Sequence, residues 1–276
     1  MKLSLALSTL LSITAVSAAP SNLQNRVRAR EVGRQATGTR GSQPLVKLAG
    51  TEFKETVNGT AHVSYSSNWS GAVLEAPPPG TTFTSAHGRF TVPTPKHVGS
   101  GGSESSSAWV GIDGDTYGNA ILQAGVDFTV SSSGAVTYDS WYEWYPDYAY
   151  DFTGFAVKAG DVIQIDIVAT TTSKGTVTLT NETTGKAVSK TLSAPSTSAK
   201  LGGQNAEWIV EDFEENGSLV ALSNFGTVVF TGATAGTAAG TSVGLTGATI
   251  IDLKQGTTVY TDVIINSASQ VTVKYI

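Results

Sequence analysis

The chain has 276 residues, a formal net charge of −5 at pH 7 and no cysteine. Without cysteine it has no disulfide, no thiol nucleophile and no cysteine-ligated zinc site. The acidic balance argues against a nucleic-acid partner, which would require a basic surface.

The first 18 residues have the pattern of a secretory signal peptide. Lys2 supplies a positive charge, an apolar stretch follows from Leu3 to Val16, and Val16-Ser-Ala18 resembles a small-residue cleavage site. We therefore expect a secreted, extracellular protein. The apolar stretch is too short to span a bilayer, and no other segment approaches the roughly 20 apolar residues that a membrane helix needs. We expect no membrane anchor.

Charge divides the remaining chain into a basic and an acidic part. From Pro20 to Glu55 there are seven basic and three acidic residues, whereas after Glu55 there are nine basic and 19 acidic residues. We interpret residues 19–55 as a pro-segment that inhibits the following acidic domain, residues 56–276, by charge attraction. The alternative is a disordered basic arm that binds a polyanion. The acidic part is long enough for one large domain, which we expect to be monomeric.

Short alternating segments rich in β-branched residues dominate the acidic part, and segments with helical periodicity are nearly absent. This pattern predicts an antiparallel β-sandwich. Hairpins are expected at Ser131–Gly134 and Thr180–Lys186, and a flexible loop at Gly99–Ser107. The expected strands cover 88–92, 107–111, 120–130, 135–145, 161–168, 175–180, 226–230, 257–264 and 270–276.

Two of these segments carry a polar group among apolar neighbours. In Ala120-Ile-Leu-Gln123-Ala-Gly125 the alternation places Gln123 opposite a core-facing triplet. In Ala206-Glu-Trp-Ile-Val-Glu211-Asp-Phe213 it places Glu211 opposite Trp208 and Val210, with a bulge or strand end expected near Asp212. A carboxylate accepts a proton from water, and an amide donates to an oxyanion without titrating. Such a pair is suited to chemistry in acid.

The order of these motifs resembles the glutamic peptidase (eqolisin) family of secreted acid endopeptidases. Ser67-Asn-Trp69-Ser-Gly71, Ala108-Trp-Val-Gly-Ile-Asp-Gly-Asp115 and Trp141-Tyr-Glu-Trp-Tyr-Pro146 complete the set, which runs from about Tyr65 to Phe230. The resemblance implies a concanavalin-like sandwich of two curved sheets, polypeptide substrates and a catalytic dyad of Gln123 and Glu211. Family members carry disulfides, and this chain departs from them in having none.

The resemblance leads to a mechanism. Glu211 would take a proton from a water that attacks the scissile carbonyl, and Gln123 would stabilise the oxyanion. We expect insensitivity to pepstatin, because no pair of aspartates shares a proton. Five residues are candidate walls or substrate contacts of the cleft, although large aromatic residues more commonly fill a core; they are Trp69, Trp109, Asp113, Glu143 and Tyr145.

The same residues also allow other functions to be considered. A β-sandwich glycoside hydrolase with Glu143 and Glu211 as its acid/base pair, or a lectin-like carbohydrate-binding protein, remains the alternative. Asp113-Gly-Asp115 resembles the start of a calcium loop, but later ligand positions do not fit. We expect neither a metal nor a cofactor. Four sequons make glycosylation possible, at Asn58, Asn68, Asn181 and Asn216.

Overall fold

The computed structural model describes residues 39–56 and 59–276, all of whose regular elements are strands. The expected signal peptide and the pro-segment up to residue 38 lie outside the described residues. No helix in the described part of the chain is long and apolar enough to cross a membrane. The predicted all-β class is confirmed.

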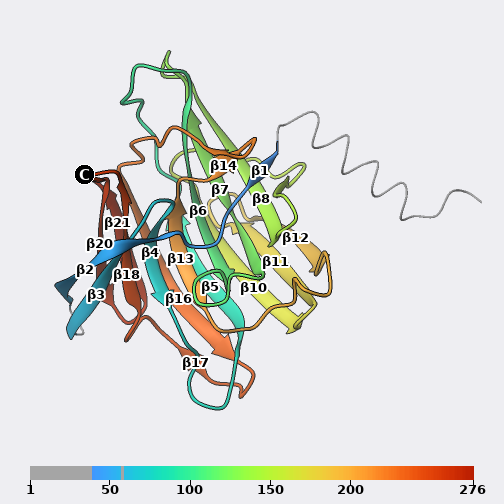
Figure 1. Ribbon diagram of the computed structural model, residues 1–276. Coiled ribbons are helices and arrows are strands. Elements are labelled where there is room, and N and C mark those ends of the chain that lie inside the picture. The colour runs from blue at the N-terminus through green and yellow to red at the C-terminus, as the bar shows by residue number, and fades with distance from the viewer. Residues whose placement is uncertain (1–38, 57–58) are drawn as a thin grey trace, which may run out of the picture. The chain divides into compact units, whose positions relative to one another are not determined.

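One sheet contains ten strands and holds both members of the expected dyad (Figure 1). All its pairs are antiparallel except the parallel pair of β3 and β18. Its strand order is β2 (Lys47–Thr56), β3 (Gly59–Ser66), β18 (Thr249–Gln255), β4 (Trp69–Leu74), β13 (Ala206–Glu211), β6 (Glu104–Ile112), β7 (Ile121–Val130), β8 (Val136–Tyr145) and β9 (Tyr150–Asp151), with β19 (Thr258–Val259) paired to β18.

A second, eight-stranded antiparallel sheet packs against one face of the first. Its order is β12 (Lys186–Ser193), β11 (Lys174–Asn181), β10 (Val162–Thr171), β5 (Phe83–Thr91), β16 (Thr227–Thr237), β21 (Gln270–Tyr275) and β20 (Thr261–Ser267), with β17 (Ser242–Val243) paired to β16. A small third sheet joins β1 (Arg40–Gly41), β14 (Glu214–Glu215) and β15 (Ser218–Leu219).

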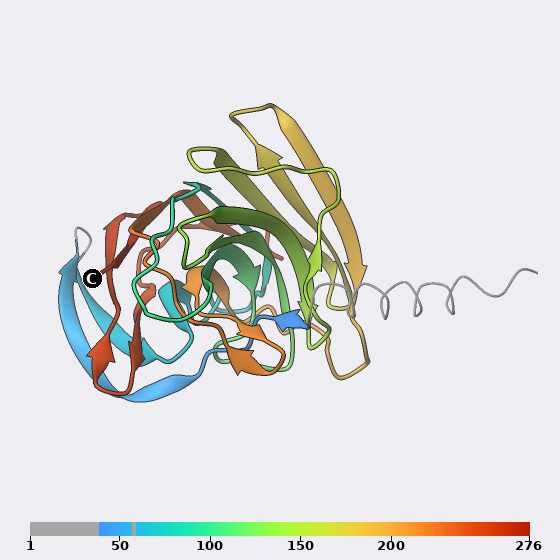
Figure 2. The same ribbon diagram turned by 90° about the horizontal axis from the view of Figure 1, so that it is seen from above.

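The strands of both large sheets curve around a shared interior (Figure 2). Apolar side chains from both sheets form the main core between them. Leu122, Ala124 and Val126 point into it from β7, and Trp208 and Val210 point into it from β13. The burial of so much apolar surface is the main stabilising contribution, and it supports a chain that has no disulfide.

The other face of the ten-stranded sheet, which we call the site face, carries a second cluster of buried apolar residues. Its members include Trp69, Trp109, Trp141 and Ile209. Trp69 and Trp109 pack edge to face, with ring centroids 4.9 Å apart. The faces predicted from the alternation of β7 and β13 are therefore confirmed, and the site face is itself largely buried.

Most strand predictions are confirmed, with corrections at the boundaries. The hairpins at Ser131–Gly134 and Thr180–Lys186 connect β7 to β8 and β11 to β12. The loop expected at Gly99–Ser107 is too long, because β6 already begins at Glu104, whose carboxylate accepts the N–H groups of residues 98 and 99. The single strand expected at 257–264 is divided into β19 and β20.

Candidate active site

The register of the strands places Gln123 at the centre of the site face. Gln123 lies opposite Gly111 of β6 and opposite Glu143 of β8. It is fully buried, yet neither the nitrogen nor the oxygen of its amide has a hydrogen-bond partner. Buried polar groups are nearly always paired, so this free amide indicates a position prepared for a ligand group.

Glu211 is the last residue of β13 and faces the same side of the sheet. Its Oε2 accepts the indole N–H of Trp109 at 2.8 Å, and its Oε1 accepts the backbone N–H of Gln43 at 3.2 Å. Burial raises the pKa of Glu211 to about 7, although these hydrogen bonds and the charge of Arg40 act in the opposite direction. The carboxyl can therefore hold or release a proton near neutral pH. As expected, the strand ends before Asp212.

The chain between β1 and β2, which belongs to the expected pro-segment, runs across the ten-stranded sheet (Figure 1). We call residues Arg40–Val46 the strap. The N–H of Ser42 donates to Oε2 of Glu143 at 3.1 Å, and the indole N–H of Trp69 donates to the carbonyl of Gln43 at 3.0 Å. Asn68 accepts the N–H of Val46, and Leu45 packs against the apolar cluster of the site face.

Arg40 anchors the N-terminal end of the strap. Its guanidinium forms a two-pronged ion pair with Asp127, one prong being 2.8 Å from Nη2 to Oδ1, and donates to the hydroxyl of Ser107 at 3.1 Å. It also lies over the rings of Trp141 and Phe213, at 3.9 and 4.5 Å from the centroids. These contacts offset the cost of removing the guanidinium cation from water.

Glu143 and Tyr145 lie beside the strap, on the same face of β8. Burial raises the pKa of Glu143 well above its ordinary value, and Arg40, 3.7 Å away, only partly offsets this effect. Both residues border a hollow of about 210 Å³ between the strap, β8 and β14. The structure thus gathers Trp69, Trp109, Glu143, Tyr145 and the two residues of the expected dyad on one face of the ten-stranded sheet.

Asp113 has different surroundings. Its two carboxylate oxygens accept the backbone N–H groups of residues 202–205, at 2.7 to 3.3 Å. Its own backbone has a positive φ of 70°. These contacts favour a structural role, holding a loop to the start of β13, over the substrate contact that we expected for it.

Three residues at the site were not expected there from the sequence; they are Arg40, Asp127 and Glu207. Asp127 lies four residues after Gln123 on the same strand, so both side chains point to the same face. This alternation could have indicated Asp127 from the sequence. Glu207 is fully buried with both oxygens unpaired, and burial raises its pKa well above the ordinary value. It reaches over Gly111, where a Cβ would lie 2.7 Å from Oε1 of Glu207 and 3.3 Å from Cβ of Gln123.

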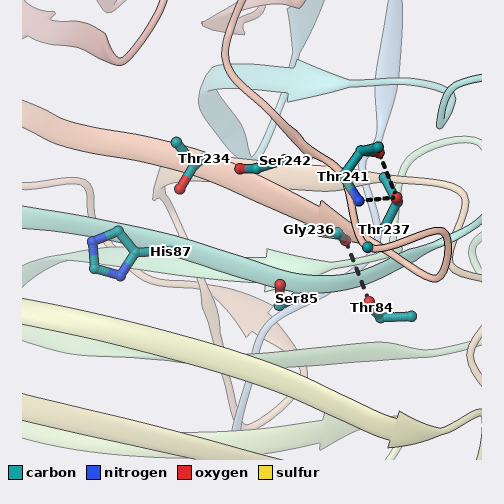
Figure 3. A pocket seen from close by; sticks show the side chains of 9 residues that line it. Thr84, Ser85, His87, Thr234, Gly236, Thr237, Thr241 and Ser242 are labelled. Carbon is teal, nitrogen blue, oxygen red and sulfur yellow. Dashed lines mark hydrogen bonds between the residues drawn. The ribbon is translucent and has the colours of Figure 1, made fainter.

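A second hollow, of about 360 Å³, lies on the eight-stranded sheet and is lined by hydroxyl groups (Figure 3). His87 at its edge pairs with Asp166 at 2.6 Å, but its ring lies apart from Ser85, so the three do not form a nucleophile with its base. Within residues 39–56 and 59–276 no cluster of ligating side chains could hold a metal ion.

Comparisons with known proteins agree with this geometry. The Peptidase A4 family matches residues 67–275. Aspergillopepsin-2 of Aspergillus niger is 43% identical over 294 aligned residues, covering 100% of both chains. Scytalidopepsin B of Scytalidium lignicola is 41% identical over 215 residues, covering 77% of this chain and 74% of the relative.

Two solved structures extend the likeness to the fold. Scytalido-glutamic peptidase, solved with a transition-state analogue inhibitor, matches with a TM-score of 0.67 and 39% identity over 76% of this chain and 98% of its own. Aspergilloglutamic peptidase of Aspergillus niger matches with a TM-score of 0.59 and 48% identity over 63% and 99%. The fold, the site and these matches together show that the chain is an endopeptidase of the peptidase A4, or eqolisin, family of glutamic peptidases.

Proposed function

We propose that this eqolisin is a secreted endopeptidase active at low pH, that Gln123 and Glu211 are its catalytic dyad, and that its own pro-segment inhibits it. The observation that carries this proposal is the strap. It lays polypeptide backbone across the site face with the N–H of Gln43 on the Glu211 carboxylate. In peptide hydrolysis the leaving nitrogen needs a proton donor, and Glu211, once protonated, lies 3.2 Å from a backbone nitrogen in this position.

The chemistry divides between the two side chains. Ionised Glu211 takes a proton from water as the water attacks the scissile carbonyl, and then returns that proton to the leaving nitrogen. The unpaired amide of Gln123 donates to the oxyanion of the tetrahedral intermediate. The indole N–H of Trp109 on Oε2 fixes the orientation of the Glu211 carboxylate. No aspartate pair takes part, so pepstatin should not inhibit the enzyme.

The pKa of Glu211 links the proposed mechanism to activity at low pH. The pKa of about 7 belongs to a carboxyl covered by the strap, and burial is its main cause. Departure of the strap removes the Arg40 charge and the Gln43 hydrogen bond, which lower the pKa of Glu211, but it also admits water, and desolvation is the largest contribution to the raised pKa. The uncovered enzyme can therefore keep Glu211 ionised at a lower pH than the covered one.

The strap inhibits because it occupies the cleft without completing the catalytic contacts. The Gln123 amide has no hydrogen bond to it, so no strap carbonyl is held where an oxyanion would form. Leu45 and the carbonyl of Gln43 nevertheless fill positions on the site face that a substrate needs. Peptide backbone and apolar side chains in these positions support polypeptide substrates over the carbohydrate alternative.

Acidification would release the strap through its ion pairs. Arg40 is surrounded by Asp127 and Glu143 and feels the charges of Glu211, Asp139 and Asp151. Protonation of these carboxylates leaves a buried cation without a partner, which is strongly unfavourable. The pro-segment then dissociates and becomes a substrate, and cleavage between Leu45 and Tyr65 would complete maturation.

The decisive experiment compares three secreted full-length proteins at pH 3: wild type, Gln123→Ala and Glu211→Gln. We expect the wild type to shorten itself and to digest a denatured protein in the presence of pepstatin. Loss of the oxyanion donor in Gln123→Ala should reduce the rate by about 100- to 1,000-fold. Glu211→Gln cannot accept a proton and should remain full length. Maturation of Glu211→Gln at the normal rate, with no other protease present, would refute self-processing.

A further inference from the structure

One row of residues crosses the site face on four neighbouring strands. Gly111 of β6 lies opposite Glu207 of β13 on one side and opposite Gln123 of β7 on the other. Glu143 of β8 follows Gln123 in the row. Adjacent strands are about 5 Å apart, so the backbones of Glu207 and Gln123 are separated by about 10 Å. Because Gly111 has no side chain, both of these side chains border the space where its Cβ would be.

The polar atoms of Glu207 and Gln123 are buried without partners. Neither carboxyl oxygen of Glu207 has a hydrogen bond, and neither has the nitrogen or the oxygen of the Gln123 amide. Leaving such groups unpaired is costly, so a functional pairing is expected for them. A protonated carboxyl offers one O–H donor, and an amide oxygen accepts one. The two groups therefore complement each other while Glu207 carries a proton.

The surroundings of Glu207 favour its protonated form. Burial raises the pKa of Glu207 well above its ordinary value, and the charges of Asp113 and Asp115, from the loop after β6, raise it further. Lys47 pairs with Asp115 at 3.0 Å and so offsets one of these two charges. On the other edge of β13, the residue opposite Glu207 is Val73 of β4, which does not titrate. Glu207 is therefore protonated in acid.

Two other carboxyls on the site face already contact the backbone of the strap. Glu211 accepts the N–H of Gln43, and Glu143 accepts the N–H of Ser42. Both are therefore placed to contact the backbone of a substrate. Glu207 makes no such contact, since both of its oxygens are unpaired among the described residues. Of the three carboxyls, Glu207 is the one available to hold Gln123.

We propose that Glu207 is a positioning residue whose protonated carboxyl donates its O–H to Oε1 of Gln123, and that loss of this proton ends activity as the pH rises. The inference rests on the proposed function, because it uses the role of Gln123 as oxyanion donor. With Oε1 held, the N–H groups of the amide are turned towards the substrate. An ionised Glu207 instead accepts one of these N–H groups, which turns the amide round, and it places a negative charge near the developing oxyanion.

The test measures kcat and KM separately for matured wild type, Glu207→Leu and Glu207→Gln on one quenched peptide from pH 2 to pH 8. Tryptophan fluorescence at each pH shows where each protein is folded. Glu207→Leu should lower kcat about 10-fold at acidic pH with little change in KM, because the amide loses its hydrogen bond but the substrate contacts remain. Glutamine keeps a donor and cannot ionise. Glu207→Gln should therefore recover most of the lost kcat, and its alkaline limit should lie about one pH unit or more above that of the wild type.

Glu182→Gln is the matched control, since it removes a carboxylate on the other sheet and should keep the wild-type pH profile. An alkaline limit that is the same in Glu207→Gln as in the wild type would overturn the positioning role, whether it coincides with unfolding or moves only in Glu143→Gln. If Glu207→Leu does not fold, the profile of Glu207→Gln decides alone. Cleavage of no peptide by the wild type at any pH would instead refute the proposed function, and the role of Glu207 with it.

Discussion

Replacement of Glu211 by glutamine should flatten the pH dependence of stability. Glu211 has a pKa of about 7 in the folded chain, against an ordinary value of 4.5, mainly because it is buried. Between these values the folded state holds a proton that the unfolded state has released, so stability falls as pH rises. Each unit is worth about 1.4 kcal/mol, which makes the total loss about 3 kcal/mol, of which about 2 kcal/mol falls between pH 5 and 7.

The measurement is urea unfolding of the full-length chain at pH 5, 6, 7 and 8, followed by the fluorescence of the five buried tryptophans. Gln123→Ala serves as the parent, because it suppresses self-digestion, and Gln123→Ala with Glu211→Gln is the comparison. Glutamine cannot ionise, so the free energy of unfolding of the double variant should fall by about 2 kcal/mol less between pH 5 and 7. Parallel curves for the two proteins would refute the reasoning.

Three other predictions follow from single contacts. Asp113→Ala leaves the N–H groups of residues 202–205 without an acceptor, so the free energy of unfolding in urea titrations should fall by about 2 to 4 kcal/mol. A loss below about 0.5 kcal/mol would contradict the structural role of Asp113. Arg40→Gln weakens the hold of the strap, so the pH of half-maximal self-processing should rise, and an unchanged midpoint would contradict the release mechanism. Asn216 is exposed and Asn181 is buried, so the glycosidase-sensitive mass shift should be smaller in Asn216→Gln than in the wild type and unchanged in Asn181→Gln.

The parts of the fold that depend on neighbouring residues could be predicted from the sequence. Alternation of side chains along β7 and β13 determines which residues face the main core, and so places Gln123 and Glu211 on the opposite face. The turn residues between alternating runs likewise mark both hairpins. These features follow from a period of two along a strand, and they need no knowledge of distant contacts.

The contacts that give the site its character join segments far apart in the chain. Arg40 meets Asp127 across 87 residues, and Gln43 meets Glu211 across 168. No local pattern indicates which basic residue of the pro-segment enters the cleft. The role of Asp113 could not be predicted for a similar reason. A carboxylate beside a cleft motif looks the same in the sequence whether it contacts a substrate or accepts hydrogen bonds from backbone amides.

The most direct test of the account is proteolysis by Glu211→Gln. The secreted wild type and this variant are acidified to pH 3 with pepstatin, and cleavage of a denatured protein is followed by mass spectrometry. We expect new peptides from the wild type and none from the variant, because an amide cannot take the proton from the attacking water. Digestion by Glu211→Gln at a rate comparable to the wild type would contradict the role of Glu211 as the catalytic base.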